Sequence, residues 1–233
     1  TVKGNVMRQR NIKNLQAKLE MNSSFLIDEP CGCKGRWREI FGNSNPIFLE
    51  IGCGKGQFIM RCAEAFHGRN FIAIEGQSNV ALRALQKAEE KRLENLRIFI
   101  SYVDDLRDFF AEGELSGIFL NFSDPWPKAR HAKRRLTYRR RLLNYKEVLA
   151  PGSFVEFKSD NDGLFEFTLE EIEEAGLEIF EMTRDLHGDA EMGGCESGER
   201  RAATASRREP VITTEYEDRF REKGKNINYV KFR

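Results

Sequence analysis

The chain of 233 residues has no long apolar run and few cysteines, and both shortages exclude classes of protein. No stretch approaches the roughly 20 apolar residues that a transmembrane helix needs, and the N-terminus lacks the apolar core of a signal peptide. The five cysteines are an odd number, and Cys31-Gly32-Cys33 has neither the spacing nor the partner pair typical of a zinc site. We therefore expect a cytoplasmic protein with reduced thiols, no membrane association and no metal.

Net charge is also nearly absent, because 38 Lys and Arg offset 37 Asp and Glu to leave +1 at pH 7. The total indicates no particular partner, but the charges are segregated along the chain. Residues 128–141 contain eight Lys or Arg plus His131, whereas residues 166–181 contain seven glutamates and no Lys or Arg. Such segregation predicts a basic face that binds phosphates on a protein that is otherwise acidic.

Short apolar, β-prone runs alternate with helical segments from residue 46 onward. This alternation is typical of βαβ units, which build a parallel sheet with helices on both faces. The predicted strands are residues 47–51, 71–75, 96–101, 117–121, 153–158, 177–182 and 227–232. The predicted helices are residues 57–66, 80–93, 103–110, 133–149 and 164–175.

The two ends of this pattern differ from its middle. Residues 1–45 are polar and weakly periodic, which predicts an N-terminal arm with a short helix near 35–41. The domain itself is expected at 46–233. Within it, residues 188–210 are small, polar and glycine-rich, which predicts a flexible surface loop.

A glycine-rich turn at residues 52–56 joins the first predicted strand to the first helix. Its glycines, Gly52, Gly54 and Gly56, allow a sharp turn and a close approach of the backbone to a ligand. Nineteen residues later Glu75 ends the second strand, where doubly wound folds place the acid that binds ribose hydroxyls. The combination predicts a site for a nucleotide-type cofactor.

The glycine spacing and the residue before the turn indicate which cofactor. The dinucleotide fingerprint is G-x-G-x-x-G, whereas this turn reads G-x-G-x-G after Glu50. A carboxylate suits a cofactor with a cationic amino-acid end better than it suits a pyrophosphate. S-adenosylmethionine, with its sulfonium and ammonium groups, is therefore the expected cofactor, and nicotinamide cofactors fit less well.

A second motif, residues 121–127, reads Asn-Phe-Ser-Asp-Pro-Trp-Pro and lies between an apolar strand and the basic run. Taken alone it is either a tight turn into a solvated basic helix or a fixed carboxylate, Asp124, beside a surface for a polyanion. The presence of a cofactor turn earlier in the chain favours the second interpretation.

With both motifs in view, the chain resembles bacterial tRNA (guanine-N7-)-methyltransferases from about Arg8 to the C-terminus. The resemblance is carried by Glu-Ile-Gly-x-Gly-x-Gly at 50–56, by Glu75, and by Leu-Asn-Phe-Ser-Asp-Pro-Trp-Pro-Lys-x-Arg-His-x-Lys-Arg-Arg at 120–135. Phe-Lys-Ser-Asp-Asn at 157–161 and Thr-Glu-Tyr-Glu at 214–217 agree with it.

The resemblance implies an α/β class I S-adenosylmethionine-dependent methyltransferase fold. This Rossmann-like fold has a seven-stranded mixed sheet whose last strand is antiparallel. It also implies an RNA-binding enzyme whose partner is tRNA and which methylates N7 of guanine at position 46, in the variable loop. The sequence leaves both a monomer and a homodimer open.

The resemblance and the glycine turn together assign the site residues. Asp124 is the expected catalytic residue. The expected cofactor-binding residues are Glu50, Gly52, Gly54, Glu75, Tyr102 and Asp124. The expected substrate-binding residues are Lys128, Asp160, Thr214, Glu215, Tyr216 and Glu217.

Two departures from the family pattern affect these assignments. Tyr102 stands where the family usually has an Asp or Asn that helps hold the adenosine, with Asp104 and Asp105 just beyond. Either the backbone or one of these two acids is then expected to take that role. The other departure is the 188–210 loop, which is longer than the usual link to Thr214.

The expected chemistry needs no general base, because guanine N7 carries a lone pair and no proton. The enzyme has to hold the base in line with the methyl group and to stabilise the positive charge that develops on the purine. Asp124 and Asp160, each after a predicted strand, are suited to both tasks. Trp126 either stacks on the target base or packs as a structural residue, and His131 is expected to be structural.

Three other functions compete with this interpretation. The first is a methyltransferase for small molecules or proteins, and the basic run behind Asp124 counts against it. The second is an RNA-binding protein without catalysis, and the presence of all four acids Glu50, Glu75, Asp124 and Asp160 counts against it. A dinucleotide oxidoreductase is disfavoured by the glycine spacing.

Overall fold

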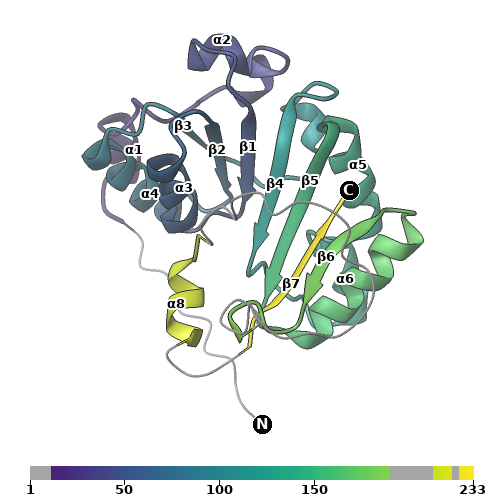
Figure 1. Cartoon of the computed structure of the whole chain (residues 1–233). Helices are drawn as coiled ribbons and strands as arrows, with labels where there is room; N and C mark the ends of the chain where they lie inside the picture. Colours follow the sequence, from purple (N-terminus) through teal and green to yellow (C-terminus); the bar gives the residue numbers. More distant parts are fainter. Residues whose placement is uncertain (1–11, 189–211, 222–225) are drawn as a thin grey trace.

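The sheet determines where the site lies. The computed structural model describes residues 12–188, 212–221 and 226–233, and within them seven strands form one sheet in the order β3-β2-β1-β4-β5-β7-β6 (Figure 1). The strands are β1 (Ile47–Ile51), β2 (Asn70–Glu75), β3 (Leu96–Ile100), β4 (Leu115–Asn121), β5 (Leu149–Ser159), β6 (Ile179–Thr183) and β7 (Asn228–Phe232). β1 to β5 are parallel, and β7 is antiparallel to both of its neighbours. The seven-stranded mixed sheet with an antiparallel last strand is thus confirmed.

Helices cover both faces of the sheet (Figure 1). The described helices are α1 (Leu15–Glu20), α2 (Trp37–Phe41), α3 (Gln57–Ala65), α4 (Ser78–Lys91), α5 (Arg139–Val148), α6 (Asp162–Glu174) and α8 (Glu215–Arg221). Short 3-10 turns are η1 (Pro30–Cys33), η2 (Leu106–Asp108) and η3 (Ala129–Arg134). One core packs the sheet against α5 and α6, and the other packs it against α3 and α4.

The residues of β1 alternate between these two cores. Ile47, Leu49 and Ile51 belong to the core beside α5, whereas Phe48 belongs to the core beside α3. Because side chains alternate along a strand, Glu50 shares the face of Phe48. An acid is thereby placed in a core at the end of a buried strand, where hydrophobic residues are the rule.

The described part of the N-terminal segment packs on the edge of the sheet. Trp37 in α2 is fully buried, and its Nε1 donates a hydrogen bond to the carbonyl of Phe109 at 2.9 Å. Leu26 forms a parallel β-bridge with Ile98 of β3. The division between an arm and a domain at residue 45 stays a prediction. The predicted loop at 188–210 also stays a prediction, because only its first residue lies within the described residues.

Two predicted helices are wrong in this structure. Residues 103–110 contain only the 3-10 turn η2, which Asp105 caps by accepting a hydrogen bond from the N–H of Arg107. The predicted helix at 133–149 is divided into η3 and α5 by an extended stretch that includes Arg135 and Tyr138. The cause is tertiary, because Arg135 is committed to the turn after β4 and Thr137 is buried with its hydroxyl on Thr168.

Candidate active site at the carboxyl edge of the sheet

The glycine turn lies between the ends of β1 and β2, beside the point where the strand order reverses between β1 and β4. The N–H groups of Gly52 and Cys53 donate to the carbonyl of Ile74 at 2.8 and 3.1 Å, and Gly54 N–H donates to Glu75 Oε2 at 2.9 Å. Gly52 and Gly54 have φ of 76° and 58°, a region that other residues adopt rarely. The turn therefore holds the N-terminus of α3 against the end of β2.

Glu50 is the buried acid at the end of β1, with 2% of its surface exposed. Its Oε1 accepts a hydrogen bond from Asn121 Nδ2 at 2.9 Å, whereas Oε2 has no hydrogen bond of normal geometry within the described part of the chain. Burial raises the pKa of Glu50 to about 7, although the hydrogen bond from Asn121, the backbone N–H of Ile59 and the charge of Lys158 oppose the rise. Buried polar groups are normally fully hydrogen-bonded, so the incomplete pairing of this carboxylate is an exception that needs an explanation.

Glu75 and Tyr102 lie at the ends of β2 and β3. Glu75 accepts the N–H of Gly54 on Oε2 and the N–H of Gln77 on Oε1, the latter at 2.9 Å. A carboxylate has about four acceptor positions, so Glu75 can still accept hydroxyl groups. Tyr102 is 78% exposed, an unusual fraction for a large aromatic residue.

The turn that contains Asp124 has strained backbone on both sides. Phe122 and Trp126 have φ of 50° and 41°, which is rare for bulky residues and costs of order 1–3 kcal/mol each. The Phe122 N–H donates to the carbonyl of Lys158 in β5, and the Arg135 guanidinium donates to the carbonyls of Pro125 and Trp126. These bonds fix the turn and leave Asp124 exposed at the carboxyl edge.

The basic run divides into cations with partners in the fold and cations that point to solvent. Arg139 pairs with Glu174, and Arg141 pairs with Asp104 at 3.1 Å. Arg134 lies 4.9 Å from the ring centroid of Trp126, and Trp126 packs against His131, which gives the tryptophan a packing role. The exposed cations of the run are Lys128, Arg130, Lys133, Arg134 and Arg140.

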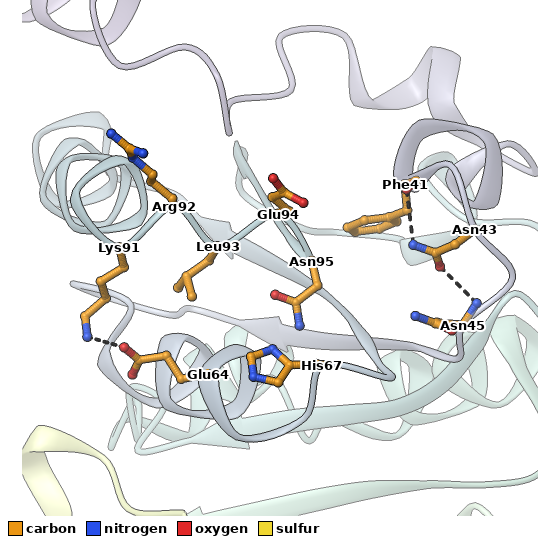
Figure 2. Close-up of a pocket in the computed structure, with 10 residues that line it drawn as sticks. All are labelled: Phe41, Asn43, Asn45, Glu64, His67, Lys91, Arg92, Leu93, Glu94 and Asn95. Carbon is orange, nitrogen blue, oxygen red and sulfur yellow. Dashed lines mark hydrogen bonds and ion pairs between the residues drawn. The ribbon is translucent and has the colours of Figure 1, made fainter.

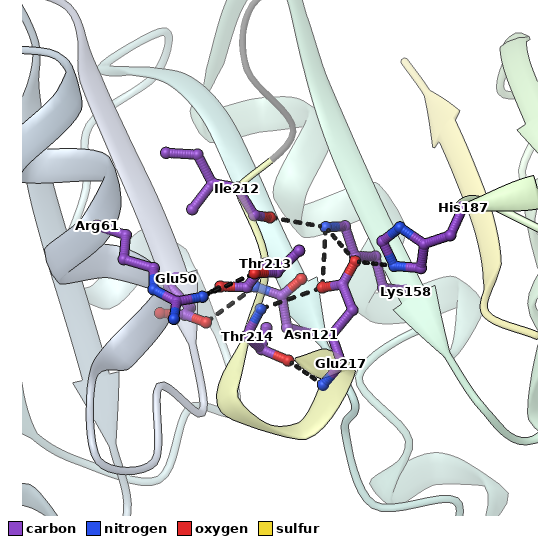
Figure 3. Close-up of polar contacts among 9 residues, drawn as sticks. All are labelled: Glu50, Arg61, Asn121, Lys158, His187, Ile212, Thr213, Thr214 and Glu217. Atoms are coloured by element: carbon purple, nitrogen blue, oxygen red, sulfur yellow. Dashed lines mark hydrogen bonds and ion pairs between the residues drawn. The ribbon is translucent and has the colours of Figure 1, made fainter. Parts of the chain in front are cut away.

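Residues 212–218 cross the carboxyl edge of the sheet and are anchored by a buried ion pair (Figure 3). Lys158 Nζ donates to the carbonyl of Ile212 at 3.1 Å and lies 3.2 Å from Glu217 Oε2. The side chains of Lys158 and Glu217 are 4% and 0% exposed. His187 Nε2 lies 2.9 Å from Glu217 Oε1, so three separate parts of the chain meet at this carboxylate.

Thr214 and Glu217 also begin helix α8 with a capping box. The Glu217 N–H donates to Thr214 Oγ1 at 2.9 Å, and the Thr214 N–H donates to Glu217 Oε2 at 3.1 Å. The structure therefore uses both side chains inside the fold, and their contact with substrate stays a prediction.

The other two residues of the Thr-Glu-Tyr-Glu motif lie at the surface and face the site. Glu215 lies 3.9 Å from Lys55 of the glycine turn. Tyr216 is 53% exposed, and its ring centroid lies 5.7 Å from that of Phe122. The motif thus contacts both the glycine turn and the turn of Asp124.

The carboxyl edge brings together most of the residues expected from the sequence. Four acids lie at or just after the ends of adjacent strands: Glu50, Glu75, Asp124 and Asp160. Lys128 is the first of the exposed cations along the chain. Sequence patterns did not single out Asn121 and Lys158, although both lie within the quoted motifs. His187 carried no signal, because it precedes a polar loop with no periodicity.

A cavity of about 550 Å³ lies at the opposite edge, near the amino ends of β2 and β3 (Figure 2). Its lining includes Glu64, His67, Lys91 and Asn95, and Glu64 forms an ion pair with Lys91 across it. This position separates the cavity from the acids and from the glycine turn at the carboxyl edge.

Within the described residues, no helix has the length and apolar character needed to cross a bilayer. The same part of the chain contains no group of three or more His, Cys, Asp or Glu arranged to hold a metal ion. Cys53 and Cys62 are buried free thiols, and burial raises the pKa of both.

Two solved structures of methyltransferases share this fold at low sequence identity. "Structure of an Antibiotic Related Methyltransferase" matches with a TM-score of 0.58 at 15% identity, covering 85% of this chain and 92% of that one. The 30S ribosomal A1408 methyltransferase from an uncultured bacterium matches with a TM-score of 0.53 at 11% identity, with the same coverage. At these identities the likeness shows the fold alone.

Sequence comparison identifies the family. A family model described as "Putative methyltransferase" matches residues 44–230. The tRNA (guanine-N(7)-)-methyltransferase of Brevibacillus brevis is 43% identical over 225 residues, which are 96% of this chain and 97% of that protein. That of Oceanobacillus iheyensis is 41% identical over 221 residues, which are 95% and 96% of the two chains. The chain therefore belongs to the tRNA (guanine-N7-)-methyltransferase family, whose enzymes take their methyl group from S-adenosylmethionine.

Proposed function

We propose that this protein transfers a methyl group from S-adenosylmethionine to N7 of guanine at position 46 in the variable loop of tRNA. The observation that carries the proposal is the pairing of an acidic strand edge with exposed cations directly behind it. Asp124 follows β4, and Lys128 and Arg130 follow within six residues, all exposed. This arrangement supports the proposal, because a carboxylate would then face the reacting base and positive charge would face the phosphates that flank it.

The residues at the ends of β1 and β2 fit the cofactor. Glu50 would bind the ammonium end, since its buried Oε2 has no hydrogen bond of normal geometry in the described chain. Glu75 would accept the ribose hydroxyls, and the backbone of Gly52 and Gly54 would allow the close approach. The chemistry supplied by bound S-adenosylmethionine is an electrophilic methyl group on a sulfonium.

The acids at the ends of β4 and β5 would orient the guanine. Asp124 and Asp160 can accept hydrogen bonds from the guanine N1–H and amino groups, which directs N7 toward the methyl group. Their negative charge also stabilises the positive charge that grows on the purine during transfer. Since N7 carries no proton, neither acid has to remove one.

The site of methylation can be mapped by incubating an unmodified tRNA transcript with enzyme and S-adenosylmethionine, followed by borohydride and aniline cleavage. We expect a single cleavage, at guanine 46, and none in a matched transcript with adenine at that position. Cleavage at another guanine would show that position 46 is not the methylated position. Labelled methyl groups on protein or metabolites, with none on tRNA, would overturn the substrate class.

The exposed cations should determine the salt dependence of tRNA binding. We expect a variant with Lys128, Arg130, Lys133 and Arg140 changed to Ala to bind tRNA more weakly. The slope of log affinity against log salt should fall by about one for each lost phosphate contact. The matched control is Arg139→Ala, because Arg139 is paired with Glu174 and its loss should leave the slope unchanged. An unchanged slope in the quadruple variant would mean that tRNA binds to a different surface of the protein.

A further inference from the structure

Tyr102 lies on a glycine that the backbone does not require. An ideal Cβ built on Gly76 would lie 2.4, 2.6 and 2.9 Å from Cε1, Cδ1 and Cζ of the Tyr102 ring, distances that real Cβ atoms do not show. Gly76 is not among the residues with positive φ, so its conformation is open to other amino acids. A side chain at position 76 would therefore have to displace the ring from its place on the glycine.

The ring lies on Gly76 without being buried. Tyr102 is 78% exposed although one side of the ring is in contact with Gly76. The other face of the ring is thereby open to solvent, where a planar ligand group could pack on it. Gly76 directly follows Glu75, the acid for which we propose a role in ribose binding, and the Ser101 N–H donates to the carbonyl of Glu75 at 3.1 Å. The exposed ring is thereby placed beside the ribose acid.

The two acids that follow Tyr102 are already committed to other residues. Asp104 pairs with Arg141 at 3.1 Å. Asp105 accepts hydrogen bonds from the backbone and the guanidinium of Arg107, which lowers the pKa of its carboxyl. Both acids are thus paired with arginines, whereas the Tyr102 ring lies on Gly76, the residue after Glu75.

We propose that Tyr102, supported by Gly76, is the surface on which the adenine of the cofactor stacks, in place of a side-chain hydrogen bond to the purine. This inference rests on the proposed binding of S-adenosylmethionine. Stacking contacts the flat face that every purine has, whereas a carboxylate accepts hydrogen bonds from particular N–H groups on the edge of the purine. The site should accordingly tolerate a change of the substituent at C6 of the purine.

Calorimetry with S-adenosylhomocysteine, adenosine and inosine tests the proposal on the full-length protein. We expect Tyr102→Ala to weaken S-adenosylhomocysteine and adenosine equally, by about 10- to 100-fold, and Tyr102→Phe to retain most of the affinity. Wild-type affinities for inosine and adenosine should differ by only a few fold.

The Gly76→Ala variant supplies a double-mutant cycle. Alone it should weaken adenosine binding, because the added methyl group displaces the ring; in the Tyr102→Ala background it should have almost no further effect. Equal losses in both backgrounds, or wild-type affinity in Tyr102→Ala, would overturn the role of the ring. Failure of the wild-type protein to bind S-adenosylhomocysteine would instead overturn the proposed function.

Discussion

Replacing Asp124 with asparagine should reduce the rate of methyl transfer by at least about 100-fold while leaving the fold intact. The substitution keeps the size of the side chain and removes its negative charge, the charge that we propose faces the guanine. Loss of one group that stabilises charge in a transition state typically costs 100- to 1,000-fold in rate. Single-turnover transfer to tRNA, measured with saturating cofactor and enzyme, isolates the chemical step.

The fold should tolerate this change because Asp124 is exposed and its side chain makes no hydrogen bond within the described residues. Substitutions at such positions usually alter stability by no more than about 0.5 kcal/mol. The matched control is Glu90→Gln, the loss of an exposed carboxylate on α4, which should leave the rate unchanged. Turnover at the wild-type rate in Asp124→Asn would refute the catalytic role.

The chemistry of guanine N7 separates a charge stabiliser from a general base. A base at Asp124 would have to remove a proton, and guanine N7 has none to lose. We therefore interpret Asp124 as a residue that orients and stabilises. The strained φ angles of Phe122 and Trp126 on either side of it agree with a carboxylate whose position is fixed before the substrate arrives.

The sheet and the place of the site were predictable from sequence because both follow from local patterns. Each central strand is a short apolar run, and the carboxyl ends of parallel strands meet at one edge. Glu50 and Asp124 could therefore be placed close together, although 74 positions separate them in the chain. The antiparallel last strand came from the family resemblance, not from periodicity.

What could not be predicted depends on contacts between distant residues. The helix expected at 133–149 is interrupted because Arg135 bonds the carbonyls of Pro125 and Trp126, and no periodicity reveals such a contact. Glu217 appears from its motif to be an exposed acid, yet it is buried against Lys158, which lies 59 positions earlier. The motifs contain both Lys158 and Glu217, but a sequence pattern does not show that the two side chains form an ion pair with each other.

Glu50 should give protein stability and cofactor binding opposite dependences on pH. Its pKa is about 7 in the folded protein and close to 4.5 when the chain is unfolded. Between these values the folded protein binds more protons, so stability should fall as pH rises from 4.5 to 7 and then stay level. A shift of this size corresponds to roughly 3 kcal/mol, and thermal unfolding across this pH range measures it.

Cofactor binding should change in the other direction, because the ammonium end needs the ionised carboxylate. Affinity for S-adenosylhomocysteine should decrease by up to about tenfold for each pH unit below 7. Adenosine lacks the amino-acid end, so its binding should show no such dependence. Calorimetry of both ligands from pH 5.5 to 8 makes the comparison within one protein.

The Glu50→Gln variant connects the two effects to one group. It should remove this contribution to the pH dependence of stability and weaken S-adenosylhomocysteine by about 30-fold or more, while adenosine binding is preserved. An unchanged pH profile of unfolding in this variant would assign the titration to another group. Unchanged affinity would mean that the buried carboxylate does not bind the ammonium. A carboxylate that costs stability near neutral pH would then lack the function that explains its presence in the core.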